Sequence, residues 1–272
     1  LKDNRHAGIS RLKSARIMEQ ALTLYAVPGI PLVKPGDNLF EIISRAISES
    51  NERLRDNDII VIAQKIVSKA ENRIISLDDV EVTAEAVNIA RETDKDPRQI
   101  ELVLRESREI IRRRPGVIIV EQNLGIVMAN AGIDHSNIES EGKAERVLLL
   151  PVDPDETCRK IRAKVKENLK VSVGVIINDS VGRAWRVGTT GLAIGVAGLP
   201  AVVDLRGKKD IFGRELLVSE QAVADELASA ASLLQGQASE KLPVVIVRGF
   251  SSDAPHQNAS ALIRDKEMDM FR

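Results

Sequence analysis

Short runs of apolar residues mark the strands that the sequence predicts. The segments "DIIVIA", "VSVGVII" and "LPVVIVRG" are continuous and rich in Val and Ile, which is typical of buried strands. A further strand, "ALTLYAV", ends at the prolines and glycine of "PGIP", and "VIIVEQNLGIVMAN" indicates a hairpin of two apolar strands. The segment "GLAIGVAGLPAVVDL" carries a glycine every few residues, which indicates close backbone packing in strands or at an interface.

Helical periodicity appears between these runs. Asp37 is a candidate N-cap for a helix with one apolar face. We expect two more helices within residues 83–113, separated at Asp96-Pro97, with three arginines at the last helical end, where cations suit the helix dipole. The apolar face comprises Leu39, Ile42, Ile43, Ala46 and Ile47, and the arginines are Arg112, Arg113 and Arg114.

Two later helices also have identifiable starts. Asp153 is a predicted N-cap, followed by Pro154 at the first helical position. Cys158 lies in that first turn as a lone thiol with no nearby histidine, so we expect it to be inert. Ser219 is the predicted cap of a last helix that reaches about Leu234. Because strands and helices are mixed without a regular βαβ repeat, the pattern favours an α+β fold.

Composition narrows the classes of function. Aromatic residues make up 2% of the chain, and 39 basic residues balance 40 acidic ones, so the stacking platforms and basic surfaces of nucleic-acid-binding proteins are lacking. We therefore expect no nucleic-acid partner. No apolar run approaches the roughly 20 residues that span a bilayer, so we expect no membrane partner either. A single cysteine fits a reducing cytoplasm. The three histidines show no zinc-ligand spacing, which leaves oxygen ligands as the expected metal chemistry.

Neither standard phosphate-binding motif, GxxxxGK[ST] or GxGxxG after a strand, occurs in the chain, so a nucleotide would need other loops. The glycine of "VPGIPL" lets backbone N–H groups approach an anion or serves a rigid turn. Lys65 and Lys69 share a helical face, which either neutralises phosphate or is simply solvated. In "ANAGIDHSN", Asp134, Ser136 and Asn137 carry oxygens that suit Mg²⁺ or Mn²⁺, although these residues also form ordinary turns.

The stretch "INDSVGRAWRVGTTG" is the strongest candidate for chemistry. Asp179 and Ser180 follow a buried strand directly, and Arg183 and Arg186 come shortly after. A carboxylate and a hydroxyl at a strand end hold metal in many phosphoryl-transfer sites, while arginines meet the phosphates. Together with "ANAGIDHSN", this second acidic segment suggests two metal ions. For Trp185 we expect a buried packing role, with a cap over a ring-shaped substrate as the alternative.

Taken together, these segments resemble the coenzyme F420-0:L-glutamate ligases, also called F420 gamma-glutamyl ligases. The similarity runs from about Leu24 to the C-terminus through "VPGIPLVKPGDNL", "AQKIVSKAENR", "ANAGIDHSN", the long segment beginning "INDSVGRAWRVGTTG", "VSEQAVADELA" and "ALIRDKEMDMFR". The resemblance implies the α+β fold of this family, with mixed, largely antiparallel sheets, in an intertwined homodimer. It also implies activation of the acceptor carboxylate as an acyl phosphate by GTP, followed by attack of the L-glutamate amine. Further gamma-linked glutamates would extend the product.

The resemblance carries roles to individual positions. It implies Asp179, Arg183 and Arg186 as catalytic residues and Asp134, Asp179, Ser180 and Gln221 as metal ligands for two Mg²⁺ or Mn²⁺ ions, with K⁺ as a candidate additional ion. Gln221 stands where some members carry a glutamate, and Asn72 where the family usually has glycine. The implied GTP contacts are Gly29, Ile30, Pro31, Leu32, Gln64, Lys65, Lys69, Asn137, Ser219, Glu220, Gln221, Ala222, Val223, Ala224, Asp225 and Glu226.

The expected organisation is an N-terminal extension over residues 1–20, a ligase domain over 21–250 and a C-terminal tail over 251–272 that belongs to the ligase. Two intertwined subdomains are the alternative for the middle part. The main hypothesis is a cytoplasmic ligase that acts on GTP, L-glutamate and a deazaflavin precursor. The alternatives are the same chemistry on another acceptor, such as a folate, and an inactive nucleotide-binding protein. Acidic residues in both candidate segments favour the enzyme.

Overall fold

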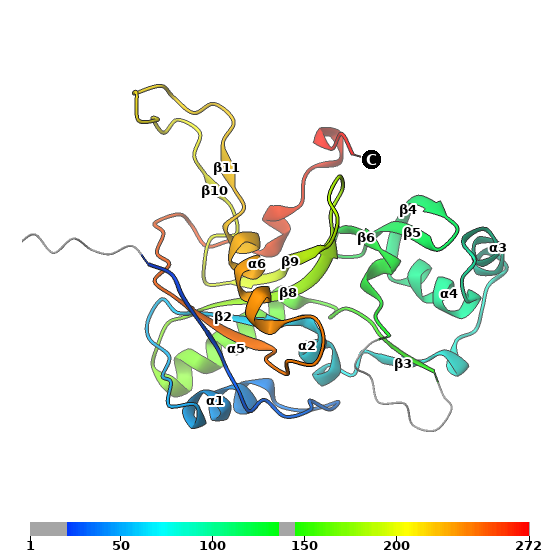
Figure 1. Cartoon of the computed structure of the whole chain (residues 1–272), viewed down its shortest axis with the longest axis horizontal. Coiled ribbons are helices and arrows are strands. Elements are labelled where there is room, and N and C mark those ends of the chain that lie inside the picture. The colour runs from blue at the N-terminus through cyan, green and yellow to red at the C-terminus, as the bar shows by residue number, and fades with distance from the viewer. Residues whose placement is uncertain (1–20, 136–144, 272) are drawn as a thin grey trace, which may run out of the picture.

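The computed structural model describes residues 21–135 and 145–271 (Figure 1). At its centre lies a five-stranded sheet in the order β1-β12-β2-β8-β9, in which β2 and β8 are parallel and the other neighbours antiparallel. Smaller sheets pair β3 with β7, β4 with β5 and β6, and β10 with β11. The α+β prediction is therefore confirmed. The strands are β1 Thr23–Ala26, β2 Ile59–Ala63, β3 Ile74–Ser76, β4 Ser107–Arg114, β5 Val117–Gln122, β6 Val127–Ala129, β7 Arg146–Leu148, β8 Gly174–Gly182, β9 Thr189–Ala197, β10 Val203–Asp204, β11 Glu220–Gln221 and β12 Val244–Arg248.

Helices cover both faces of the central sheet. The predicted apolar face of α1 is buried in one cluster with side chains of α5, while α6 packs on the opposite face. Branched aliphatic residues fill both layers, as expected for strands rich in Val and Ile. The α-helices are α1 Leu39–Glu49, α2 Gln64–Ala70, α3 Ala84–Thr93, α4 Pro97–Arg105, α5 Pro154–Leu169 and α6 Val223–Gln235.

A second, smaller lobe packs α3 and α4 on the β4–β5–β6 sheet around its own apolar cluster (Figure 1). Helix α4 begins as predicted, with the Asp96 side chain accepting a hydrogen bond from the Arg98 N–H and Pro97 in the first turn. The predicted helical end at the three arginines is wrong. Helix α4 stops at Arg105, and residues 112–114 end strand β4, which pairs with β5. Cross-strand pairing therefore prevailed over the local helical pattern.

Two glycines of β9 explain its glycine-rich sequence. A Cβ at Gly191 would lie 2.5 Å from the Ala228 carbonyl oxygen of α6, and one at Gly195 would lie 2.7 Å from Pro154 of α5. Both helices thus approach the strand too closely for any side chain, which confirms the predicted backbone packing.

Helix starts were predicted with mixed success. Asp153 caps α5 through a hydrogen bond from the Glu156 N–H, as expected, and Cys158 lies on the buried face of that helix. The N-cap of α1 is Asn38, because the Asp37 carboxylate instead accepts from the Lys34 N–H in the preceding turn. Helix α6 starts after Ala222, so the predicted cap at Ser219 is wrong.

Two further segments lie outside the central sheet, its helices and the smaller lobe. The segment between β10 and β11 leaves the body as a long arm, and the C-terminal segment returns along the outer side of β9 (Figure 1). Asp155 of α5 holds that return in place, since its carboxylate accepts hydrogen bonds from the N–H groups of Val196 and Ala259. The predicted extension over residues 1–20 lies outside the described residues. No helix in the described part of the chain is long and apolar enough to cross a membrane.

Candidate active site

An acidic pair, Asp134 and Asp179, forms the centre of the candidate site. Strands β2 and β8 run parallel, and Ala63, the last residue of β2, is paired with Asn178 within β8, so the carboxyl end of β2 lies beside the middle of β8. Asp179 is the next residue of β8, and Gln64 and Lys65 open α2 directly after β2. The two segments therefore bring the predicted lysine and carboxylate together.

Asp134 reaches the same place from the smaller lobe. Its backbone N–H donates to the Leu148 carbonyl and its carbonyl accepts from the Leu148 N–H, which ties the segment after β6 to β7. Its carboxylate Oδ2 lies 2.7 Å from Lys65 Nζ. Gln64, 2% exposed, is fixed by the Ser68 hydroxyl, which donates to its Oε1 at 2.8 Å. From this position the Gln64 side chain lowers the pKa of Asp179.

The charge of Asp179 depends on this surrounding. Burial raises the pKa of Asp179 to about 6, and the negative charge of Asp134 raises it as well. Three features lower the pKa of Asp179: the Ser180 N–H, which donates to Oδ1 at 2.8 Å, the positive charge of Lys65 and the side chain of Gln64. A cation bound beside Asp179 would stabilise its charged carboxylate, which the surroundings disfavour. The acidic pair is therefore suited to binding a cation.

Two carboxylates suit Mg²⁺ or Mn²⁺, because such ions are often held by one or two carboxylates together with water and substrate phosphate oxygens. The described residues contain no group of three or more His, Cys, Asp or Glu side chains placed to hold a metal. The remaining ligands would have to come from substrate and water. The residues present therefore fit a metal that binds together with nucleotide.

The structure brings Ser180 to this site through its backbone only. Successive strand residues point to opposite faces of the sheet, and the Ser180 hydroxyl accepts a hydrogen bond from Gln237 Nε2 beyond the end of α6. Asp179 and Ser180 also lie within β8, which continues to Gly182, so their predicted position after the strand end is wrong.

Gln221, the other implied ligand, lies in β11 at the base of the arm. Its amide donates to Glu226 Oε2 at 2.8 Å, and it makes no contact with the acidic pair in the described structure. Gln221 precedes α6, which starts at Val223, so it shares no helical face with Asp225. Asp225 instead turns toward β9, where its Oδ1 accepts from the Ala193 N–H at 2.9 Å.

The expected nucleotide segments are only partly gathered. Residues 29–32 form the loop between β1 and α1, where Gly29 has a φ of 79° and Leu32 is exposed. Lys69 lies one turn after Lys65 on α2. Residues 219–226 span β11 and the start of α6, and Ser136 and Asn137 lie outside the described residues. Which of these segments contact GTP stays a prediction.

The β8–β9 hairpin carries Arg183 and Arg186 at its tip. Arg183 is four residues beyond Asp179, which corresponds to about 13 Å along a strand. The structure therefore does not bring these arginines to the acidic pair. Trp185, 88% exposed with a φ of 63°, lies at the same tip, so its predicted buried role is wrong. Its ring faces Phe271 of the C-terminal segment, with 6.4 Å between ring centroids.

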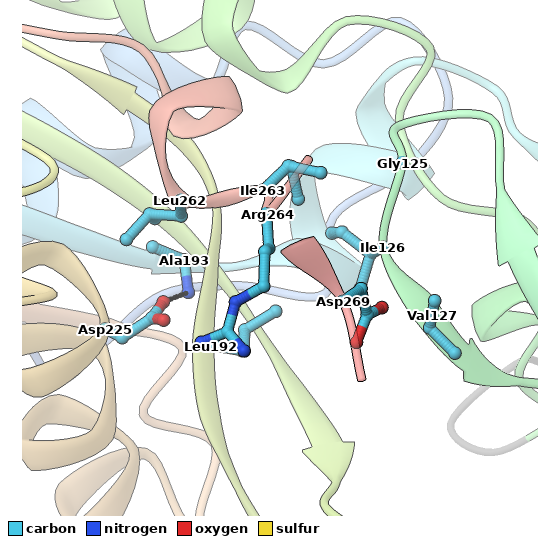
Figure 2. A pocket seen from close by; sticks show the side chains of 10 residues that line it. All are labelled: Gly125, Ile126, Val127, Leu192, Ala193, Asp225, Leu262, Ile263, Arg264 and Asp269. Carbon is cyan, nitrogen blue, oxygen red and sulfur yellow. Dashed lines mark hydrogen bonds between the residues drawn. The ribbon is translucent and has the colours of Figure 1, made fainter. Parts of the chain in front are cut away.

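Sequence reasoning missed one cavity, of about 200 Å³, beside this hairpin (Figure 2). Elements far apart in the chain form it: the start of β6, strand β9, helix α6 and the C-terminal segment. Arg264 and Asp269 contribute charged side chains from that last segment. No local motif marks such a cavity, because the polar positions become neighbours only after the C-terminal segment has folded along β9.

Comparison with known proteins shows the family to which the chain belongs. Residues 29–249 match the family described as F420-0:gamma-glutamyl ligase. A coenzyme F420:L-glutamate ligase of Methanothermobacter thermautotrophicus is 46% identical over 253 residues, covering 92% of this chain and 99% of that protein. The proteins of the same name from Methanocaldococcus jannaschii (43% identical; 89% and 94% covered) and Archaeoglobus fulgidus (40% identical; 92% and 96% covered) are similar over nearly their whole length. With matches of this extent, the chain belongs to the F420-0:gamma-glutamyl ligase family.

Proposed function

We propose that the protein is a GTP-dependent ligase that joins L-glutamate to a carboxylate of the deazaflavin precursor F420-0. The observation that carries the proposal is the acidic pair with Lys65 against Asp134, where β2 ends beside the parallel strand β8. Its oxygen ligands and adjacent cation suit a triphosphate with a divalent metal. Relatives named coenzyme F420:L-glutamate ligase supply the identity of the amine and the class of acceptor.

A carboxylate is a poor electrophile, so the reaction needs an activation step. The acceptor carboxylate oxygen attacks the γ-phosphorus of GTP, a new P–O bond forms and the bond to GDP breaks. The amine of L-glutamate then attacks the carbonyl carbon of the acyl phosphate, a C–N bond forms and phosphate leaves with the electrons of the broken C–O bond. The amine proton passes to solvent. A bound divalent metal, one or two ions, would supply positive charge to the phosphates.

The residues of the chain divide the work between them. Asp134 and Asp179 would hold the metal, and the Gln64 side chain favours the charged form of Asp179 by lowering its pKa. Without substrate, the positive charge of Lys65 offsets the negative charge of Asp134. When a metal ion binds beside Asp134 instead, the lysine would contact a phosphate of the nucleotide. Arg183 and Arg186 at the hairpin tip would contact the outer part of a substrate. Further gamma-linked additions require only that the first product return as acceptor.

The homodimer is part of the same proposal. The arm between β10 and β11 projects from the body (Figure 1) and exposes four large apolar side chains to solvent. Side chains of this kind gathered on one projecting segment mark an interaction site. A second copy of the chain is the occupant that the family resemblance implies. The four residues are Ile211, Phe212, Leu217 and Val218.

An acceptor panel tests the function. The purified protein is incubated with GTP, Mg²⁺ or Mn²⁺, L-glutamate and either F420-0 or a folate, and the acceptor is followed by mass spectrometry. We expect one or more glutamyl additions to F420-0, with release of GDP. Addition to the folate alone would keep the chemistry and change the acceptor. Absence of product and of GDP with both acceptors would contradict a ligase and leave a nucleotide-binding protein.

A further inference from the structure

The cavity beside β9 lies next to the acidic pair. Leu192 lines it and is the cross-strand partner of Asp179. Directly paired residues of neighbouring strands present their side chains on the same face, so the cavity wall continues into the surroundings of Asp179. The expected nucleotide segments after β1 and β2 lie on the other side of β8 in the sheet, whereas the expected segment 219–226 reaches the cavity through Asp225. The cavity therefore borders the reaction centre on the β9 side of the sheet.

Its size selects among the substrates. A cavity of about 200 Å³ is below the 300–1,000 Å³ that is usual for drug-sized ligands. A free amino acid fits such a space, whereas a tricyclic deazaflavin or a guanine nucleotide does not.

The charges in the cavity are of both signs. Figure 2 shows the Arg264 side chain pointing into it, between Asp225 and Asp269. Arg264 has no ion-pair partner within 4.0 Å among residues 21–135 and 145–271. Asp225 uses Oδ1 to accept from the Ala193 N–H, while Oδ2 makes no hydrogen bond to a described residue. A guanidinium and a carboxylate with unused hydrogen-bonding capacity thus face one small space.

Burial raises the pKa of Asp225, which means that its surroundings disfavour the charged carboxylate. A cationic group beside Oδ2 would offset that cost. An α-amino acid brings such a cation together with a carboxylate for Arg264, which prefers planar carboxylate partners.

We propose that this cavity is the subsite for the incoming L-glutamate, with Arg264 binding one of its carboxylates and Asp225 receiving its ammonium group. The inference rests on the proposed ligase function. It reassigns Asp225, which the resemblance places among the GTP contacts, to the amino acid. The C-terminal segment, which supplies Arg264, thereby becomes a substrate-binding element.

Steady-state kinetics of three variants test the assignment: Arg264→Ala, Asp225→Asn and, as a matched control, Arg45→Ala on the exposed side of α1. Asn at position 225 keeps an oxygen for the Ala193 N–H while removing the charge. Loss of one charge-assisted contact should raise the KM for L-glutamate roughly 10- to 100-fold in each site variant. The KM values for GTP and F420-0 should stay within about twofold of wild type, and the control should leave all three unchanged. Thermal unfolding confirms that each variant is folded.

The possible outcomes distinguish a failure of the proposed ligase function from a failure of the L-glutamate subsite. If wild type forms no glutamyl product, the proposed function fails first. If wild type is active and both site variants keep the wild-type KM for L-glutamate, the subsite assignment alone is overturned. A rise in the KM for GTP instead, in Asp225→Asn, would return Asp225 to the nucleotide and also overturn the assignment. A binding measurement with L-glutamate in the presence of GDP and Mg²⁺, by calorimetry, should show the same loss for Arg264→Ala without relying on turnover.

Discussion

Lys65 Nζ lies 2.7 Å from Asp134 Oδ2, and both groups act on the charge of Asp179. The lysine lowers the pKa of Asp179 and Asp134 raises it. The three side chains come from α2, from the segment after β6 and from β8, so no two of them are neighbours in sequence. This triad is the link between the fold and the proposed chemistry.

Removal of the lysine should disable the triad. Lys65→Met removes the cation that lies 2.7 Å from the Asp134 carboxylate, at the place proposed for the phosphates. We expect GDP release to fall by about 10²-fold or more, measured with F420-0 and L-glutamate at saturation. Lys160→Met, on the exposed side of α5, is the matched control. Unchanged kcat in Lys65→Met would exclude Lys65 from catalysis.

Asp179 should show a trade-off between stability and activity. In the metal-free folded protein its pKa is raised from 3.8 to about 6, so the folded state binds this proton more tightly than the unfolded state. That contribution to stability is full below about pH 4 and is lost as pH rises through about 6. Asp179→Asn removes the unfavourable charge. Because the side chain is half-buried, we expect a gain of only about 1–2 kcal/mol at pH 8 in EDTA.

Urea unfolding of wild type and Asp179→Asn at pH 8 and pH 4 measures this effect. The difference in unfolding free energy should shrink toward zero at the lower pH, while turnover of the variant should be abolished at any pH. An equal difference at both pH values would show that it does not come from ionisation of Asp179.

Arg248 should be essential for stability. Its Nε and Nη2 each lie 2.9 Å from a carboxylate oxygen of Asp58, which is 1% exposed, and its guanidinium stacks 5.1 Å from the Tyr25 ring centroid. The hydrogen bonds with Asp58 raise the pKa of Arg248, which keeps it charged. Arg248→Met would leave a buried carboxylate unpaired and should cost about 3 kcal/mol of unfolding free energy. Arg159→Met, whose pair with Glu156 is exposed, should cost less than about 1 kcal/mol. Comparable losses in urea titrations would contradict this distinction.

The hairpin-tip arginines should affect binding more than chemistry. Arg186→Ala and Arg183→Ala remove charges that lie about 13 Å or more along the strand from Asp179. We expect the KM for GTP or F420-0 to rise several-fold while kcat stays within about threefold. Initial-rate measurements with each substrate varied in turn give both constants. A fall in kcat of about 10²-fold at constant KM would instead place the tip at the reacting phosphate.

Much of the fold could be predicted because its strands are continuous apolar runs and its main helices have a clear 3.6-residue period. The buried face of α1 and the start of α5 agree residue by residue. Asn72 has a φ of 56°, a conformation that glycine and asparagine tolerate, so the asparagine found here and the glycine that the resemblance implies suit the same turn.

The failures share a physical cause. The end of α4, the exposure of Trp185 and the position of Gln221 depend on tertiary contacts that local patterns do not contain. Arg112 to Arg114 pair with β5 because a neighbouring strand satisfies their backbone groups. Asp179 and Lys65 were individually predicted, yet their meeting follows from the parallel pairing of β2 and β8. The cavity with Arg264 has no local signal at all.

Oxygen transfer tests the central claim most directly. F420-0 carrying ¹⁸O in the carboxylate to be activated is incubated with the protein, GTP, Mg²⁺ and L-glutamate, and both products are analysed by mass spectrometry. An acyl phosphate predicts a glutamylated F420 product together with one ¹⁸O atom in each released phosphate. Product formation with unlabelled phosphate would contradict activation of the carboxylate by GTP, and absence of product would contradict the ligase itself.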